Sequence, residues 1–257
     1  MTPIRRLDLP GVARRRSSRV PRCGPSPSPL TSQSGPAGVT RHVRIVAGGP
    51  RSRRRRSAAL YWTPVPDHPR FFYDLHSPDA WLAAERVVEV LGEVPEFVPV
   101  DLGRLAAGDV GPFRCAAEVD AYLEDLARRA TERGVLTPRW PHAWPPEETS
   151  FALLAATYAK QIGKVVAFSM ACFRQAFNAG RDLADRDTVF LAGAAAEIHP
   201  AALAKGAELR GTAERLERAT AEAAQAGVLD VPAVVVDGHA FHGDAELERA
   251  AEALAAR

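Results

Sequence analysis

The chain has 257 residues, enough for one large or two small domains, and its hydrophobic content of 46% is ordinary for a globular protein. No apolar run is long enough to span a membrane. The net charge of +2 hides an asymmetry, because residues 1–66 carry +13 and the rest of the chain −11. The three cysteines lie far apart and form no CxxC motif. This spacing argues against a disulfide framework and favours a reducing, cytoplasmic compartment.

Residues 1–66 hold fourteen arginines and one acidic residue, Asp8, among many Pro, Ser and Gly residues. They show no apolar periodicity, so we predict a disordered basic tail. The run at 51–56, RSRRRR, has the charge to bind nucleic-acid phosphates. A secretory signal is disfavoured, because no apolar core follows the arginines. A tail without function, or a start codon further along the chain, is preferred over a nucleic-acid arm, because charge runs alone are weak motifs.

The stretch at 71–82, FFYDLHSPDAWL, carries the central prediction. Its aromatic first half favours a buried strand over residues 70–75. Ser77 is a good N-cap, and Pro78 suits the first position of a helix. The helix would place an apolar stripe on one face, formed by Trp81, Ala84, Val88 and Leu91. Backbone N–H groups converge at such a helix start, which binds anions and lowers the pKa of a thiol, although most such serines only cap.

The segments that follow complete a recognisable order. Residues 96–102 read as a second strand, with Pro99 placing it at an edge, so the front of the chain forms a βαβ unit. Mostly helical segments and a Pro- and Trp-rich loop come next. Residues 228–242 form a strand, an Asp-Gly turn and a return strand, and a final helix ends the chain. We therefore predict an α/β fold: a thioredoxin-like core (βαβ…ββα) from residues 67–102 and 211–257, with an all-helical domain inserted at 103–210.

These motifs resemble the DsbA-like branch of the thioredoxin superfamily, and most of all the 2-hydroxychromene-2-carboxylate isomerases and kappa-class glutathione transferases. The similarity covers about residues 70–255. It rests on FYDLHSP at 72–78, GVLDVP at 227–232, FHGD at 241–244, and segments of the insert at 158–163, 173–177 and 180–183. The resemblance implies a thiol-dependent isomerase or transferase. It would act on a small aromatic or apolar compound, with glutathione or another low-molecular-weight thiol as cofactor.

The redox members of that family carry CxxC at the start of the first helix, whereas residues 77–80 here are Ser-Pro-Asp-Ala. A disulfide oxidoreductase is therefore disfavoured, because exchange needs a thiolate. The resemblance makes Ser77 the catalytic residue, whose hydroxyl can donate a hydrogen bond to a bound thiolate. It also places the cofactor against a set of five residues: Pro78, Val231, Pro232, Gly243 and Asp244.

Val231-Pro232 matches the cis-proline site of the family. A cis bond there would turn the Val231 backbone toward a peptide ligand such as glutathione. The alternative is a trans proline that only begins an edge strand.

Three positions depart from the family pattern. Asp79 replaces a common aromatic residue, and a carboxylate near a thiol raises the pKa of that thiol. Ala245 stands where an aspartate often holds the ammonium group of the ligand, a loss that Asp244 either replaces or leaves unfilled. Glu147 stands where an asparagine is common. The departures suggest a changed thiol, a changed substrate or lost activity, so a catalytically inactive DsbA-like binding or scaffold protein is the alternative function.

Several further residues carry weaker predictions. His76 could act as an acid–base group, or simply be a satisfied polar residue at a strand end. Trp140 and Trp144 would wall the substrate cleft, or only pack the Pro-rich loop. His239 and His242 match no zinc pattern, so no metal site is predicted. The expected partner is a small-molecule substrate, without a membrane, and a homodimer is left open.

Overall fold

The computed structural model describes residues 68–105, 115–141, 144 and 150–257. Its sheet has four strands in the order β2-β1-β3-β4. The strands are β1 (Arg70–Tyr73), β2 (Glu96–Pro99), β3 (Ala233–Val236) and β4 (His239–His242). Strand β1 pairs parallel to β2 and antiparallel to β3, and β3 pairs antiparallel to β4. This is the predicted topology, while the predicted basic tail at 1–66 lies outside the described residues.

Strand β1 is central because its side chains are apolar on both faces. Phe71 and Tyr73 join the larger hydrophobic cluster, where both rings contact Phe97 of β2. Phe72 points to the opposite face and joins a smaller cluster with Val98. Successive side chains of a strand alternate between faces, so one short aromatic run supplies both hydrophobic layers.

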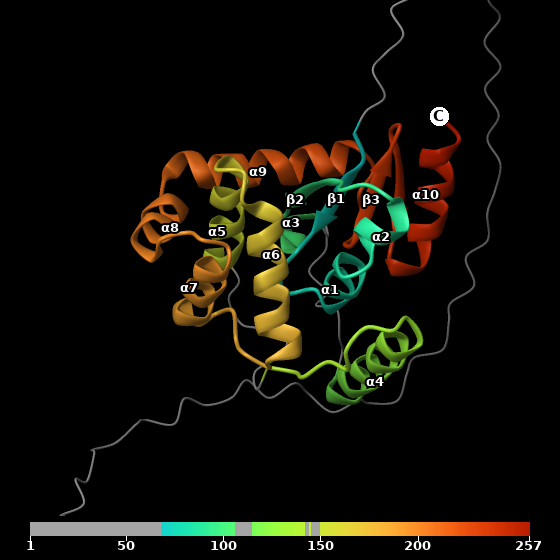
Figure 1. The fold of residues 1–257 in the computed structure, drawn as a ribbon, viewed down its shortest axis with the longest axis horizontal. Helices are drawn as coiled ribbons and strands as arrows, with labels where there is room; N and C mark the ends of the chain where they lie inside the picture. Colours follow the sequence, from blue (N-terminus) through green and yellow to red (C-terminus); the bar gives the residue numbers. More distant parts are fainter. Residues whose placement is uncertain (1–67, 106–114, 142–143, 145–149) are drawn as a thin grey trace, which may run out of the picture.

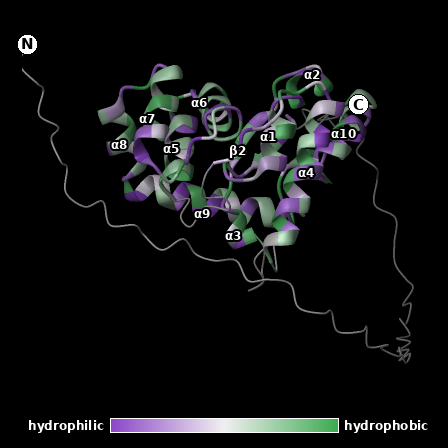
Figure 2. Ribbon diagram, turned by 90° about the horizontal axis from the view of Figure 1, so that it is seen from below, coloured by the Kyte–Doolittle hydropathy of each residue, from purple (hydrophilic) through white to green (hydrophobic). Residues whose placement is uncertain are grey.

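Helices cover both faces of the sheet and build a separate group beside it. They are α1 (Pro78–Ala84), α2 (Val87–Leu91), α3 (Leu102–Leu105), α4 (Ala116–Glu132), α5 (Ser150–Gln161), α6 (Val165–Phe173), α7 (Arg186–Ala195), α8 (Pro200–Ala207), α9 (Arg210–Gln225) and α10 (Leu247–Ala255). In Figure 1, α5 to α8 gather on one side of the sheet, and α2 and α10 lie on the other. The ribbons of Figure 2 alternate hydrophilic and hydrophobic residues, as expected of helices with one buried face.

Among the described residues, every element between β2 and β3 in chain order is helical. This agrees with a helical insertion, although its exact boundaries at 103 and 210 stay a prediction. The described helices include none with the length and apolar character that a membrane crossing needs.

The predicted first helix is broken in two. It divides into α1 and α2 around Glu85 and Arg86, and Val88 is 38% exposed instead of buried on a common stripe. No Gly or Pro marks this break in the sequence. Arg86 instead donates a hydrogen bond to the carbonyl oxygen of Asp244 at 3.2 Å, and α2 packs on α10. The break therefore accompanies a tertiary contact that helical periodicity does not encode.

The substitution Gly206→Ala is expected to destabilise the protein by about 1–3 kcal/mol, because overpacking forces neighbouring atoms to move. Helices α8 and α5 pack so closely at Gly206 that an added Cβ would lie 2.3 Å from the Tyr158 ring. Urea denaturation measures the effect. Gly211→Ala is the matched control, because its Cβ would meet only the mobile end of Arg215, at 3.2 Å. Equal stability of the two variants would contradict this account.

Candidate functional site

Ser77 caps the N-terminus of α1. Its Oγ accepts a hydrogen bond from the backbone N–H of Ala80 at 3.1 Å, and its own N–H donates to the carbonyl oxygen of Asp74 at 3.2 Å. The residue is 9% exposed. Among the described residues, the Ser77 hydroxyl hydrogen has no acceptor, so it can be donated to a ligand atom.

Asp74 and His76 form a pair immediately before Ser77. One carboxylate oxygen of Asp74 accepts from the His76 N–H at 2.9 Å and lies 3.2 Å from its Nδ1. The other carboxylate oxygen accepts from the N–H of Leu102 at 3.1 Å. His76 Nε2 is buried and has no partner among the described residues. Nδ1 of the imidazole therefore has Asp74 as a partner, whereas Nε2 has no hydrogen-bond partner among the described residues. A buried ring nitrogen without a partner is unusual for a purely structural side chain.

His76 borders a cavity with Trp144, Phe177 and Asp182, among other residues. The cavity measures about 10 Å³, which is room for about one water molecule. Trp144 Nε1 donates to the carbonyl oxygen of His76 at 3.4 Å. The centroid of the Trp140 ring lies 6.2 Å from that of Trp144 and 6.1 Å from that of Phe177. The structure thus brings together all three residues predicted to line the cleft, around a very small space.

Phe177 belongs to a feature that the sequence did not indicate. Helix α6 continues into a π-helical turn over Arg174–Asn178, and the carbonyl oxygen of Phe177 accepts from the N–H of Arg139 at 2.7 Å. Such turns are frequent at functional sites. The sequence gives no signal for this turn, because no residue type marks a π-helical turn.

Asp79, the first departure from the family pattern, is fully engaged. Tyr122 donates its phenolic O–H to Asp79 at 2.5 Å, and Arg129 Nη2 lies 2.7 Å from the same carboxylate. Burial raises the pKa of Tyr122 most, and the negative charge of Asp79 raises it further. The phenol therefore stays protonated and acts as the hydrogen-bond donor. The Tyr122 ring also stacks on Trp144, with centroids 5.6 Å apart. Because Arg129 compensates its charge, Asp79 opposes a nearby thiolate less than the sequence alone suggests.

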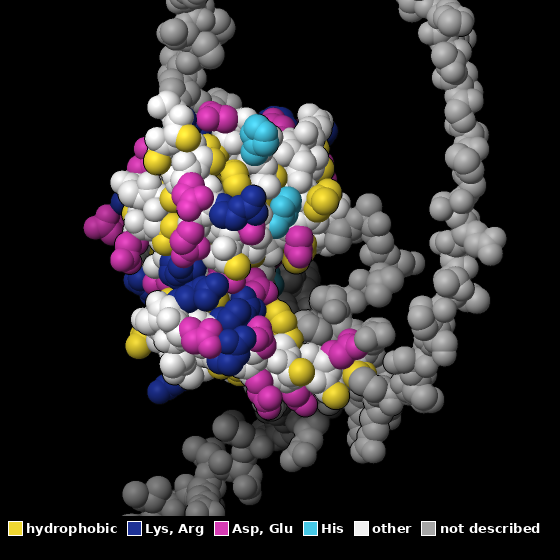
Figure 3. All heavy atoms as spheres, turned by 90° about the vertical axis from the view of Figure 1, so that its right-hand side faces the viewer, with side chains coloured by type: hydrophobic (Ala, Val, Ile, Leu, Met, Phe, Trp, Pro, Cys, Tyr) yellow, Lys and Arg dark blue, Asp and Glu magenta, His cyan; other side chains and the backbone are white. Residues whose placement is uncertain are grey.

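Arg129 also reaches Asp244, which is 4% exposed and lies in the 3₁₀ turn η2 (Asp244–Glu246). Arg129 Nη1 is 2.8 Å from this carboxylate, Arg133 contacts it, and Arg86 Nη1 is 3.7 Å away. Burial lowers the pKa of Arg129, but the carboxylates of Asp79 and Asp244 outweigh this effect and raise it. The face seen in Figure 3 correspondingly mixes Lys and Arg with Asp and Glu side chains. Asp244 therefore forms ion pairs with three guanidinium groups. Its carboxylate connects segments of this chain and is not left open to bind the ammonium group of a ligand.

The predicted cofactor residues of the last strands lie together. The Val231–Pro232 peptide bond is cis, and the N–H of Gly243 donates to the carbonyl oxygen of Pro232 at 2.8 Å. Gly243 has φ +81°, a backbone conformation that favours glycine. The adjacent Asp244 connects this corner, through Arg129, to the start of α1, where Pro78 is buried.

The cysteines behave differently from one another. Cys115 is buried and disulfide-bonded, which contradicts the prediction of a chain without a disulfide framework. Cys172 is free and buried, and burial raises the pKa of its thiol. Glu147, the third departure, lies outside the described residues. Within the described ranges, no cluster of three metal-ligating side chains is present.

The family model for a DsbA-like thioredoxin domain matches residues 70–255. Among solved structures, 2-hydroxychromene-2-carboxylate isomerase is similar, with a TM-score of 0.65 and 19% identity over 73% of this chain and 94% of that chain. A probable DsbA oxidoreductase from Streptomyces coelicolor has a TM-score of 0.58 and 18% identity, over 74% and 90% of the two chains. The cytosolic disulfide reductase DsbM from Pseudomonas aeruginosa with GSH has a TM-score of 0.50 and 16% identity, over 73% and 95%.

A comparison with curated protein sequences found no match. The identities to the solved structures show the fold alone, whereas the family match spans most of the chain. The chain therefore belongs to the DsbA-like thioredoxin domain family.

Proposed function

We propose that this protein is a thiol-dependent isomerase or transferase that acts on a small aromatic or apolar compound. Glutathione or another low-molecular-weight thiol would be its cofactor. The observation that carries the proposal is the hydroxyl of Ser77, which caps α1 and has a hydrogen to donate. It stands where redox members of the family carry a cysteine. A disulfide oxidoreductase is disfavoured, because residues 77–80 contain no sulfur.

The donor set suits the sulfur of a thiol. Ser77 would donate its hydrogen to the thiolate, and the N-terminus of α1 would add partial positive charge worth about 0.3–1 kcal/mol. The bound thiol would supply the nucleophile that adds to the substrate. Within this site, Arg129 compensates the one acidic group in the first turn of α1, Asp79.

His76 is the proposed acid–base partner. Asp74 orients its imidazole through Nδ1, and the unpartnered Nε2 is left to accept or donate a proton. This role is supported by the burial of Nε2, which has no partner among the described residues and is available to a ligand atom. Trp140 and Trp144 would supply the apolar wall for the substrate.

A specific observation favours the second candidate, an inactive binding protein on the same fold. The cavity beside His76 measures only about 10 Å³, which is far too small for a tripeptide, and Asp244 is occupied by arginines. The inactive protein would bind no thiol and turn over no substrate.

Calorimetry with the full chain separates the two candidates. We expect reduced glutathione, or another small thiol in a panel, to bind at or below millimolar concentration, and S-methylglutathione to bind more weakly because it cannot form a thiolate. If no thiol gives heat at millimolar concentration, the enzymatic proposal fails and the binding protein is favoured. A cytoplasmic location and a homodimer also stay predictions, to be checked by fractionation and by analytical ultracentrifugation.

A further inference from the structure

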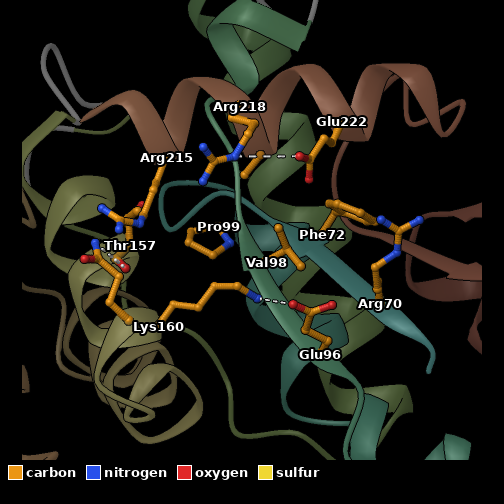
Figure 4. Close-up of a pocket in the computed structure, with 12 residues that line it drawn as sticks. Arg70, Phe72, Glu96, Val98, Pro99, Thr157, Lys160, Arg215, Arg218 and Glu222 are labelled. Carbon is orange, nitrogen blue, oxygen red and sulfur yellow. Dashed lines mark hydrogen bonds and ion pairs between the residues drawn. The ribbon is translucent and has the colours of Figure 1, made fainter. Parts of the chain in front are cut away.

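A second hollow is lined by none of the residues that line the cavity beside His76. Figure 4 shows it between the edge of the sheet at β2, helix α5 and helix α9. Its volume is about 310 Å³, at the lower end of the range for small-molecule sites. None of the residues predicted to act with Ser77 lines it. We call this hollow the α9 groove.

The floor of the α9 groove is apolar. It is formed by Phe72 of β1 with Val98 and Pro99 of β2, and the first two belong to the smaller hydrophobic cluster under α9. These side chains are already buried, with Phe72 1% and Val98 6% exposed, so a ligand on this floor gains mainly van der Waals contact. A ligand with a flat apolar body suits this floor.

The walls carry more cations than anions. Two of the four basic side chains are paired: Lys160 Nζ lies 2.6 Å from Glu96, and Arg218 Nε lies 3.8 Å from Glu222. The other two, Arg70 and Arg215, have no carboxylate partner among the described residues.

These two unpaired guanidinium groups belong to different elements. Arg70 of β1 lies over the Phe72 ring at 5.3 Å. Arg215 donates only to the carbonyl oxygen of Gly211, one turn earlier in its own helix, at 2.9 Å. In Figure 4 its side chain extends from α9 toward Thr157 of α5. The lining therefore has an excess of two positive charges above an apolar floor.

We propose that the α9 groove binds a small aromatic carboxylate. The ring would lie against Phe72, Val98 and Pro99, and the carboxylate would pair with Arg215 or Arg70. Guanidinium groups match carboxylates in planar, two-point geometry, so they favour this head group over a neutral one. The proposal is independent of the thiol chemistry at Ser77, because the two sites share no residue.

The test uses 2-naphthoate as the probe and 2-naphthalenemethanol as its neutral analogue, titrated calorimetrically into the full chain. We expect 2-naphthoate to bind, and the neutral analogue to bind at least about fivefold more weakly, because it lacks the charged hydrogen-bond acceptor. At least one of the variants Arg215→Ala and Arg70→Ala, the one that removes the guanidinium paired with the carboxylate, should weaken 2-naphthoate binding by about fivefold or more.

Arg210→Ala is the matched control. Arg210 lies on the same helix, is 93% exposed, pairs with Glu214 and does not line the groove. This variant and Ser77→Ala should retain wild-type affinity for 2-naphthoate. The proposal is overturned if 2-naphthoate does not bind at millimolar concentration, if the neutral analogue binds equally well, or if Ser77→Ala weakens binding while the groove variants do not.

Discussion

The Asp244→Ala variant is expected to lose about 3 kcal/mol of unfolding free energy, because removing one partner of a buried ion pair leaves charge uncompensated. Arg133 then has no carboxylate partner among the described residues, whereas Arg129 keeps Asp79 and Arg86 keeps Glu248. Asp244 is 4% exposed and is contacted by Arg129 and Arg133, with Arg86 nearby. Arg86 is the N-cap residue of α2, Arg129 lies in α4 and Arg133 directly follows α4, so the carboxylate connects these two segments to its own turn. Urea denaturation followed by circular dichroism measures the loss.

Glu248→Ala provides the control for Asp244. Glu248 also contacts Arg86, but its side chain is 54% exposed, and exposed pairs contribute only about 0–1 kcal/mol. If the two variants lose the same stability, the burial argument is wrong. An Asp244→Asn variant keeps the shape of the side chain and tests whether charge or packing matters.

The Ser77→Ala variant is expected to lower kcat/KM roughly 100-fold in any thiol-dependent reaction of this protein, as removal of one hydrogen-bond donor to a developing anion does elsewhere. The loss of the N-cap should also reduce stability by about 1 kcal/mol. The structural basis is the hydroxyl at the start of α1, whose hydrogen has no acceptor among the described residues. Steady-state kinetics with the thiol identified by calorimetry measures the effect.

Two further substitutions separate capping from catalysis. Asparagine is as good an N-cap as serine, so Ser77→Asn should be more stable than Ser77→Ala. Its kcat/KM should nevertheless stay as low as that of Ser77→Ala. Threonine keeps a hydroxyl, so Ser77→Thr should retain part of the activity. Wild-type activity in Ser77→Asn would assign Ser77 to capping alone.

Local chemistry accounts for the parts of the fold that were predicted from the sequence. The aromatic run of β1 and the Ser77-Pro78 pair act within a few residues, so their patterns can be read directly. The Asp237-Gly238 turn between β3 and β4 is equally local. The predicted strand over residues 228–236 is shorter in the structure, where β3 begins only at Ala233, because pairing with β1 limits it.

The break between α1 and α2 and the π-helical turn before Asn178 carry no mark in the sequence, because tertiary contacts produce them. The ion pairs of the candidate functional site are likewise not marked in the sequence. Residues Asp79, Arg129 and Asp244 are separated by 50 and 115 positions, and no periodicity could have paired them.

The strand-to-helix corner with Ser77 at its tip follows from local sequence, because capping and strand propensity depend on near neighbours. Tertiary packing alone brings arginines to Asp244, buries His76 Nε2 without a partner among the described residues and leaves a cavity of about 10 Å³ beside His76. These outcomes depend on which side chains from distant segments reach the same point in space. Packing sets that meeting point, and no local pattern encodes it.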